Sequence, residues 1–174
     1  MIELYKPDMY RKDIYDINYK KLKSYGIKCI LFDLDNTLIP CFKKRPTRKS
    51  KDLIEELKDM GFKVILFSNS GKKRLLPFKN ILEVDCSASS RKPSSKKFKK
   101  IMNDYKFREA EIAIIGDQIM TDIFGGNRVG VFSILVNPIA KKEYFFTRFN
   151  RMIEKNVIKK LEKNDLFTRG KYYE

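Results

Sequence analysis

Two aspartates, Asp33 and Asp35, follow the short apolar run Ile30 to Phe32 and could present a nucleophilic carboxylate. Side chains alternate along a strand, so both can reach one place only if the strand stops at Asp33. The run therefore predicts a buried parallel strand that ends at the carboxyl edge of a sheet, where α/β proteins bind ligands. An aspartate at a strand end can also cap a helix or fix a turn, so the pair alone does not decide function.

Three further polar clusters follow apparent strands: Ser68 with Asn69, Arg91-Lys92-Pro93, and Gly116-Asp117 continuing to Thr121-Asp122. With the two aspartates they supply carboxylates for a hard cation, a hydroxyl and an amide for phosphate oxygens, and a lysine for the remaining negative charge. This set fits phosphoryl transfer. Each cluster alone also has a structural explanation, as a turn, a helix cap or a solvated lysine.

Composition narrows the chemistry and the partners. The 174 residues include no His, so acid–base chemistry near neutral pH falls to carboxylates, Lys, Tyr or metal-bound water. The net charge of +16 favours polyanions such as RNA, anionic lipid or phosphorylated substrates, although a lysine-covered surface of biased composition explains it equally well. Three widely separated Cys without His predict reduced thiols, and charges interrupt every apolar stretch, so we expect a cytoplasmic protein.

The elements that must position these residues follow from hydrophobic periodicity. We expect one domain over residues 1–174, with a helical lead-in at 1–26, whose helix ends at Gly26, and a basic helical segment at 141–174. Strands alternating with helices indicate right-handed crossovers and a mostly parallel sheet, an α/β fold. The glycines at 125–126 follow a helix, so they predict a turn and not a phosphate loop. The predicted strands cover 27–33, 62–67, 82–86 (weakly), 112–115 and 131–136, and the predicted helices cover 47–60 and 95–105.

Four segments occur in a fixed order: Asp33-Leu34-Asp35-Asn36-Thr37-Leu38, Ser68-Asn69, Lys92-Pro93, and Gly116-Asp117 with Asp122. They resemble the four motifs of the haloacid dehalogenase (HAD) superfamily of aspartyl phosphatases. Softer strings, including Leu38-Ile39-Pro40 and Gly125-Gly126-Asn127-Arg128, are similar to its small YqeG-like subfamily over about residues 10 to 155. The resemblance implies a HAD-like Rossmannoid three-layer sandwich, and four structural coincidences in the family's order are improbable.

By this resemblance, Asp33 is the nucleophile that forms an aspartyl-phosphate. Asp35 is the acid–base that protonates the leaving oxygen and then activates water. The cofactor implied is Mg²⁺, bound by the Asp33 carboxylate, the Asp35 backbone carbonyl and the Asp117 carboxylate.

The same resemblance implies the phosphate contacts. The Ser68 hydroxyl and the Asn69 backbone amide would hold phosphoryl oxygens, and Lys92 would screen the nucleophile and grip the phosphate. Asp122 would orient Asp117 and Lys92.

The spacing between motifs leaves no room for a cap domain. Residues 38–62 accommodate one loop and one helix, and 71–92 only a crossover and a short strand. An open site suits a phosphate carried by something large. Since YqeG-like proteins are similar to phosphatidylglycerophosphate phosphatases, we expect an anionic lipid headgroup as substrate. The alternatives are a soluble or nucleic-acid phosphate, or a basic RNA- or ribosome-associated binding protein on this fold. The sequence does not indicate an oligomeric state.

The C-terminal segment mixes aromatic and basic residues, which is typical of a membrane interface. We expect the aromatic residues to pack a final helix on the sheet and the lysines to contact lipid at the inner face of the membrane. The residues concerned are Lys141-Lys142-Glu143-Tyr144-Phe145-Phe146, Arg148, Phe149, Arg151, Ile153, Lys155, Val157, Lys159 and Lys160.

Overall fold

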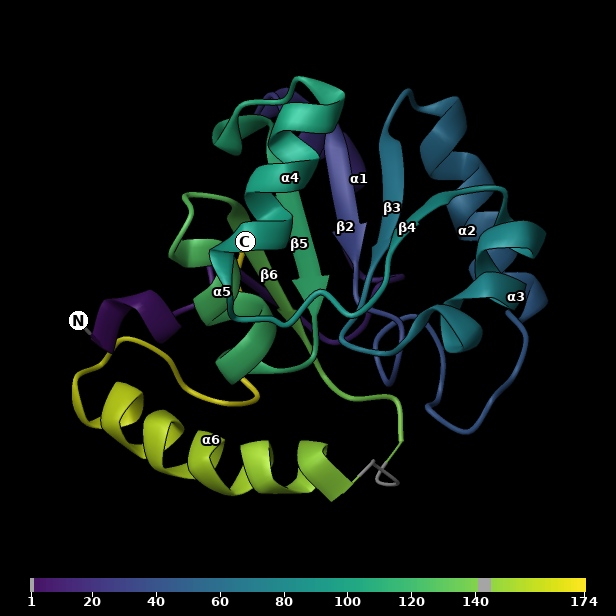
Figure 1. The fold of residues 1–174 in the computed structure, drawn as a ribbon. Helices are drawn as coiled ribbons and strands as arrows, with labels where there is room; N and C mark the ends of the chain where they lie inside the picture. Colours follow the sequence, from purple (N-terminus) through teal and green to yellow (C-terminus); the bar gives the residue numbers. More distant parts are fainter. Residues whose placement is uncertain (1, 141–144) are drawn as a thin grey trace.

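A computed structural model describes residues 2–140 and 145–174, and for 145–149 it describes the backbone alone. Its described part contains a six-stranded sheet in the order β1-β6-β5-β2-β3-β4, in which every pairing is parallel (Figure 1). The chain runs outward from β2 to one side and from β5 to the other, so the strand order reverses between these two neighbours. Ligands of open α/β sheets bind at the carboxyl ends of strands at such a point. The strands are β1 (Met9–Arg11), β2 (Cys29–Phe32), β3 (Lys63–Phe67), β4 (Asp85–Ser87), β5 (Ile112–Gly116) and β6 (Phe132–Val136).

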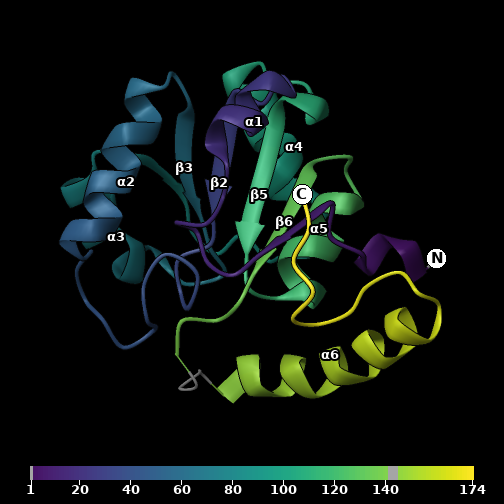
Figure 2. The ribbon, with the colours of Figure 1, turned by 180° about the vertical axis from the view of Figure 1, so that it is seen from behind.

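Helices cover both faces of the sheet and make three layers, as the two opposite views of Figures 1 and 2 show. One face carries α1 (Tyr19–Ser24), α2 (Arg48–Asp59) and α3 (Lys72–Leu82), and the other carries α4 (Ser95–Tyr105) and α5 (Phe124–Asn127). The predicted three-layer α/β fold with a mostly parallel sheet is confirmed.

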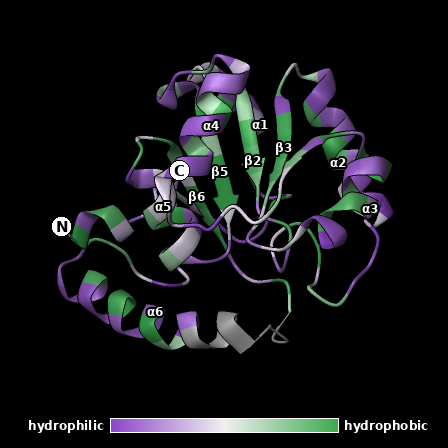
Figure 3. Cartoon of the chain, in the orientation of Figure 1, coloured by the Kyte–Doolittle hydropathy of each residue, from purple (hydrophilic) through white to green (hydrophobic). Residues whose placement is uncertain are grey.

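Side chains alternate along β2, so this strand contributes to the hydrophobic core on both faces of the sheet. Ile30 and Phe32 pack in the cluster under α1 to α3, whereas Cys29 and Leu31 pack in the cluster under α4. A parallel strand buried on both faces needs apolar residues at consecutive positions, which is why the central strands are hydrophobic throughout (Figure 3).

Two helices occur where the sequence analysis did not predict them. The crossover before β4 is the helix α3, whose basic first turn and internal Pro77 weaken the helical pattern. Because α3 extends to Leu82, the weak strand predicted at 82–86 is shifted to Asp85–Ser87. The turn predicted at Gly125 and Gly126 is wrong, since both lie in the short helix α5.

The N-terminal lead-in also differs from the predicted helix. Only Tyr19–Ser24 form α1, preceded by a 3₁₀ turn, η1 (Ile2–Tyr5), and by the edge strand β1. A three-residue edge strand is too short to show the two-residue period in the sequence. It pairs with β6, where the Asp8 carboxylate accepts a hydrogen bond from the Ser133 backbone N–H at 2.8 Å.

The C-terminal helix α6 (Phe145–Lys163) crosses the carboxyl edge of the sheet, and does not lie flat on a sheet face (Figures 1 and 2). Ile158 and Leu161 pack against Ile119 and Ile123 near that edge. The chain then returns along β1, where Tyr173 pairs with Tyr10. Within the described ranges, no helix is both long and apolar enough to cross a membrane.

Candidate active site

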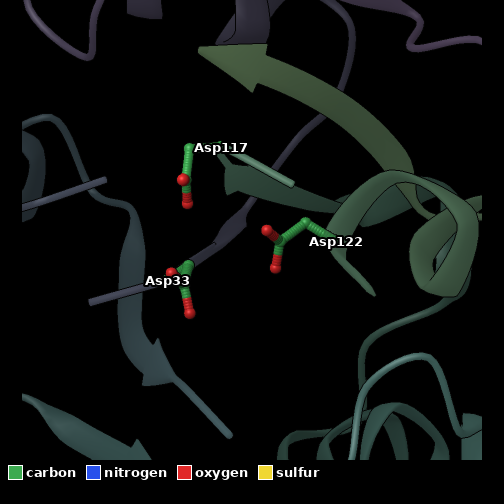
Figure 4. Close-up of side chains that lie close together, drawn as sticks. All are labelled: Asp33, Asp117 and Asp122. Carbon is green, nitrogen blue, oxygen red and sulfur yellow. The ribbon is translucent and has the colours of Figure 1, made fainter. Parts of the chain in front are cut away.

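Three carboxylates from separate segments converge at the strand-order reversal (Figure 4). Asp33 follows β2, Asp117 follows β5, and Asp122 lies in the short π-helical segment η3 (Ile119–Ile123). Their nearest oxygens lie within 4.8 Å of one another. Asp117 and Asp122 are fully buried and Asp33 is 5% exposed, so this three-carboxylate cluster lies below the protein surface.

Lys92 supplies the positive charge at the centre of the cluster. Its Nζ donates to Asp33 Oδ1 at 2.7 Å, to Asp122 Oδ1 at 2.6 Å and to the Phe67 carbonyl at 2.9 Å. An ammonium group has three N–H donors, and all three are used. Burial alone would lower the pKa of Lys92, but Asp122 and Asp33 outweigh it, so the pKa is raised and the side chain stays protonated.

Burial also shifts the pKa values of the acids in the cluster. It raises the pKa of Asp33 well above its ordinary value, while the Lys92 ammonium opposes that shift and neighbouring Asp122 and Asp117 reinforce it. Burial raises the pKa of Asp117 to about 6, against the opposing effect of the Arg151 guanidinium. Three acids with two cations leave the site one positive charge short, so further positive charge would stabilise the ionised carboxylates.

The Asp35 side chain lies apart from the cluster. Its Oδ2 accepts a hydrogen bond from Ser70 Oγ at 2.8 Å, and its Oδ1 accepts two from Arg74, from Nη2 at 2.7 Å and Nε at 3.2 Å. The sequence analysis did not identify Arg74, since it follows two lysines and has the pattern of a solvated cation. Its place a few residues after the Ser68-Asn69 motif was the available signal.

Ser68 and Asn69 lie beside Lys92, as their motif order predicts. Ser68 is buried, and its Oγ accepts the Ser70 backbone N–H at 3.1 Å. The Asn69 side chain does something the sequence did not reveal: its Oδ1 accepts the Lys92 backbone N–H at 2.7 Å, and its Nδ2 donates to the Lys92 carbonyl at 3.3 Å. Asn69 thereby ties the loop after β3 to the loop that carries Lys92.

Two neighbours fix the position of the acids. Thr37 Oγ1 donates to Asp117 Oδ1 at 2.9 Å, so the loop after β2 holds the acid after β5. At Gly116 a Cβ atom would lie 2.1 Å from Asp122 Cγ. Only glycine leaves room for Asp122 to reach Lys92.

Arg151 is the largest departure from the predicted site. The sequence analysis gave it no role in the site and named it only as part of the basic C-terminal segment, but its guanidinium pairs with Asp117 Oδ2 and donates to the Asp117 carbonyl at 2.6 Å. Arg151 reaches the site because α6 crosses the carboxyl edge of the sheet (Figure 1). Lys155, Lys159 and Lys160 are exposed. The predicted interfacial residues at 141–144 lie outside the described residues, as do the side chains at 145–149.

The predicted absence of a cap agrees with the described loops. Residues 33–47 form turns and a loop, and 68–94 contain α3 and β4 with their connections, so neither stretch holds an inserted domain. The site is nevertheless less open than predicted, since α6 covers part of its edge and the three carboxylates are buried.

The donor set fits a hard divalent cation. Carboxylate oxygens are the ligands that Mg²⁺ prefers, and three of them are gathered here. Gln118, next to Asp117, adds a buried Oε1 that has no hydrogen-bond partner among the residues the structure describes. The sequence analysis expected the carboxylates of Asp33 and Asp117 and the backbone carbonyl of Asp35 as ligands. The structure groups the Asp122 carboxylate with those of Asp33 and Asp117 and leaves the Asp35 carboxylate outside the group.

Sequence comparisons with known proteins find phosphatases. Residues 2–139 match the family model described as mitochondrial PGP phosphatase. The probable phosphatase YqeG of Bacillus subtilis is 35% identical over 161 residues, which cover 92% of this chain and 94% of that protein. Phosphatidylglycerophosphate phosphatase 1 of Arabidopsis thaliana is 27% identical over 88% of this chain, which spans only 47% of the plant protein.

Solved structures share the fold at low sequence identity. A D,D-heptose 1,7-bisphosphate phosphatase from B. bronchiseptica, complexed with magnesium and phosphate, superposes with a TM-score of 0.52 at 19% identity, covering 63% of this chain and 80% of that one. A cobalt-bound deoxy-D-mannose-octulosonate 8-phosphate phosphatase from Haemophilus influenzae gives 0.52 at 16% identity, covering 76% and 90%.

Proposed function

The chain belongs to the HAD superfamily of phosphatases, in the family of YqeG and the mitochondrial PGP phosphatases, and on this premise we propose that it is a Mg²⁺-dependent hydrolase that works through an aspartyl-phosphate. The observation that carries the proposal is the buried ion pair of Lys92 with Asp33 and Asp122, alongside Asp117. Burying such a network costs desolvation free energy, so it adds little to the stability of the fold. Networks of this kind are common at active sites.

In the first step an Asp33 carboxylate oxygen attacks phosphorus, and the bond from phosphorus to the alcohol oxygen breaks. Lys92 holds the Asp33 carboxylate by its 2.7 Å hydrogen bond and keeps one face of it oriented. The Ser68 hydroxyl and the Asn69 backbone N–H would donate hydrogen bonds to phosphoryl oxygens, since both lie in the loop next to Lys92.

Asp35 would carry the protons. Its carboxyl protonates the departing alcohol oxygen, and the resulting carboxylate then takes a proton from the water that hydrolyses the aspartyl-phosphate. Its separation from the three-carboxylate cluster supports this role, because a carboxylate committed to a metal could not exchange protons freely. Ser70 and Arg74 hold it in place.

The residues suited to hold Mg²⁺ are Asp33 and Asp117 through carboxylate oxygens and Asp35 through its backbone carbonyl. Asp122, which accepts the Gln118 backbone N–H at 3.1 Å as well as Lys92, supports them. The cation would supply charge that offsets the repulsion between an anionic nucleophile and an anionic phosphate. This chain's own contribution is a dry, preformed set of oxygens.

For the substrate we propose phosphatidylglycerophosphate, and three observations support it. The family match and the similarity to the Arabidopsis enzyme point to this lipid. No cap domain is inserted in residues 33–94, so nothing there would enclose a small metabolite. The helix α6 crosses the active-site edge (Figure 1), and its exposed Lys155, Lys159 and Lys160 could contact an anionic membrane.

The test is Mg²⁺-dependent phosphate release from phosphatidylglycerophosphate in mixed micelles, with Asp33→Asn in parallel. The native protein should release phosphate and Asp33→Asn should lose at least about a thousandfold in rate, since the amide is a poor nucleophile. Asp52→Asn, an exposed change on α2 of the same chemical kind, should remain active. Circular dichroism must show the same fold for all three proteins.

Other outcomes discriminate among the alternatives. Activity retained in Asp33→Asn refutes the nucleophile. Release only from soluble esters or phosphorylated nucleic-acid ends moves the substrate away from lipid. No release from any ester, together with salt-sensitive RNA binding, favours a binding protein on this fold. Replacing Lys155, Lys159 and Lys160 by Gln should reduce sedimentation with anionic vesicles, and unchanged sedimentation removes the proposed membrane contact.

A further inference from the structure

Arg151, on the C-terminal helix α6, contacts Asp117, which is one of the proposed metal ligands. Its Nη2 pairs with Asp117 Oδ2, and its Nη1 donates to the Asp117 carbonyl at 2.6 Å. The Arg151 side chain is only 15% exposed and Asp117 is fully buried. A guanidinium with two groups engaged on one partner is a directional contact, unlike a mobile ion pair on the surface.

Glu154 holds this arginine in place. Its Oε1 accepts from Arg151 Nη1 at 3.0 Å and its Oε2 accepts the Ile119 backbone N–H at 2.9 Å, so one carboxylate joins α6 to the start of η3. Arg169 lies 3.7 Å from the same carboxylate, beyond the end of α6. The position of Arg151 therefore depends on how α6 and the segment after it are docked.

The cations already present engage all three acids of the cluster. Lys92 pairs with Asp33 and Asp122, and Arg151 pairs with Asp117. The other Asp117 oxygen accepts the Thr37 hydroxyl at 2.9 Å. A divalent cation that binds Asp117 must therefore share or displace the guanidinium, and it does so in a buried place where like charges repel strongly.

We infer that Arg151 competes with the divalent cation for Asp117, so that the docking of α6 sets the metal affinity of the site. The inference rests on the proposed function, because it takes Asp117 as a metal ligand. The carboxylates of Asp33, Asp117 and Asp122 with the cations of Lys92 and Arg151 give one net negative charge, and removal of Arg151 leaves two net negative charges. Metal binding releases Arg151 from Asp117 Oδ2, and the contacts that hold α6 at the carboxyl edge are weakened.

The experiment is a titration with Mn²⁺, followed by the electron paramagnetic resonance signal of the free ion, and it needs no substrate. Arg151→Gln should bind Mn²⁺ roughly tenfold more tightly than the native protein, since one buried positive charge is removed. Arg151→Lys keeps the charge and should stay within about threefold of native. Lys163→Gln removes the same charge from an exposed position at the end of α6 and should leave the affinity unchanged.

The native protein provides a second readout that does not depend on any variant's stability. Hydrogen exchange of the backbone amides at 150–163 should quicken at least about twofold when Mg²⁺ saturates the site, because the Arg151 anchor is released. Exchange that is unchanged or slower overturns the inference and assigns Arg151 to orienting Asp117 for the metal. Weaker or equal Mn²⁺ binding by Arg151→Gln has the same meaning.

The two proposals fail differently. Native protein that binds neither Mn²⁺ nor Mg²⁺ refutes the metal site itself. Native protein that binds Mn²⁺, with Arg151→Gln and Lys163→Gln both indistinguishable from it, refutes only the competition by Arg151.

Discussion

At the scale of single residues, Asp33 and Asp35 are two positions apart but meet different partners. Asp33 contacts Lys92 in the buried cluster, whereas Asp35 contacts Ser70 and Arg74. The turn after β2 thus separates a carboxylate held by an ammonium group from one held by a guanidinium and a hydroxyl. This division fits the roles proposed for them, nucleophile and proton carrier, since the two groups must be neighbours without sharing a partner.

Arg74 is the residue on which the position of Asp35 depends most. It also donates to the carbonyls of Cys41 and Lys43, so it ties the loop after β2 to α3. Arg74→Gln should lower kcat roughly 10- to 100-fold, because a misplaced proton carrier loses its alignment with the leaving oxygen. Steady-state kinetics measure the effect.

The matched control is Lys73→Gln, an exposed change in the same turn, which should keep native kcat. A kcat for Arg74→Gln within twofold of native would mean that Asp35 does not need this arginine. The midpoint of urea unfolding should be recorded for both variants, to separate lost alignment from lost fold.

At the scale of elements, the site depends on how closely α5 approaches the sheet. A Cβ atom at Gly126 would lie 2.6 Å from Ile114 Cγ2 of β5, and one at Gly125 would lie 3.1 Å from Pro93 Cα, next to Lys92. These glycines form no phosphate loop. They allow a helix to pack directly against the strand and against the loop that deliver Asp117 and Lys92.

Gly126→Ala should lower the free energy of unfolding by about 1–3 kcal/mol, because the added methyl overpacks a core with no spare volume. Urea denaturation measures this difference. Gly71→Ala is the comparison: a Cβ there meets nothing within 4 Å, and we expect a smaller loss, of about 0.5–1 kcal/mol, because Ala is a poorer N-cap for α3 than Gly. Equal stability of both variants would show that α5 can shift away from β5 at little cost.

At the scale of the whole molecule, the two edges of the sheet carry different electrostatics. The carboxyl edge holds the buried acids, while at the amino edge Glu111 joins the starts of β2 and β5. Its Oε1 accepts from Lys28 Nζ at 2.7 Å, and its Oε2 accepts the Arg108 backbone N–H at 2.9 Å. These contacts, with Lys28 the largest influence, lower the pKa of Glu111 from 4.5 to about 2.

A pKa lowered by folding adds stability that is fully present above the unfolded value and disappears as the pH falls through the folded one. Glu111→Gln should therefore have a lower Tm than the native protein at pH 7, and the gap should close between about pH 4.5 and pH 2. Glu109→Gln, its exposed neighbour, should show no such convergence. Thermal unfolding followed by circular dichroism at several pH values measures both, and a gap that is constant with pH refutes the ion pair's contribution.

The residues at the ends of the strands could be read from the amino-acid sequence alone. Apolar runs stop at Asp33, Ser68 and Gly116, and parallel strands bring their carboxyl ends together, so the meeting of these motifs follows from local pattern and the topology of α/β folds. The predicted helices at 47–60 and 95–105 are observed as Arg48–Asp59 and Ser95–Tyr105, because their apolar periodicity is regular and Ser94 and Thr47 cap them.

The surroundings of these motifs, in contrast, follow from the packing of the folded chain. The inward placement of Arg151, the contact of Arg74 with Asp35 and the fastening of Lys92 by Asn69 join residues far apart in the chain. Local periodicity carries no information on how α6 crosses the sheet edge, and a buried arginine in a basic run has the same sequence signature as a solvated one. Which lysine or arginine meets a carboxylate depends on packing over the whole molecule, and so the charge balance of the site could be known only from the folded chain.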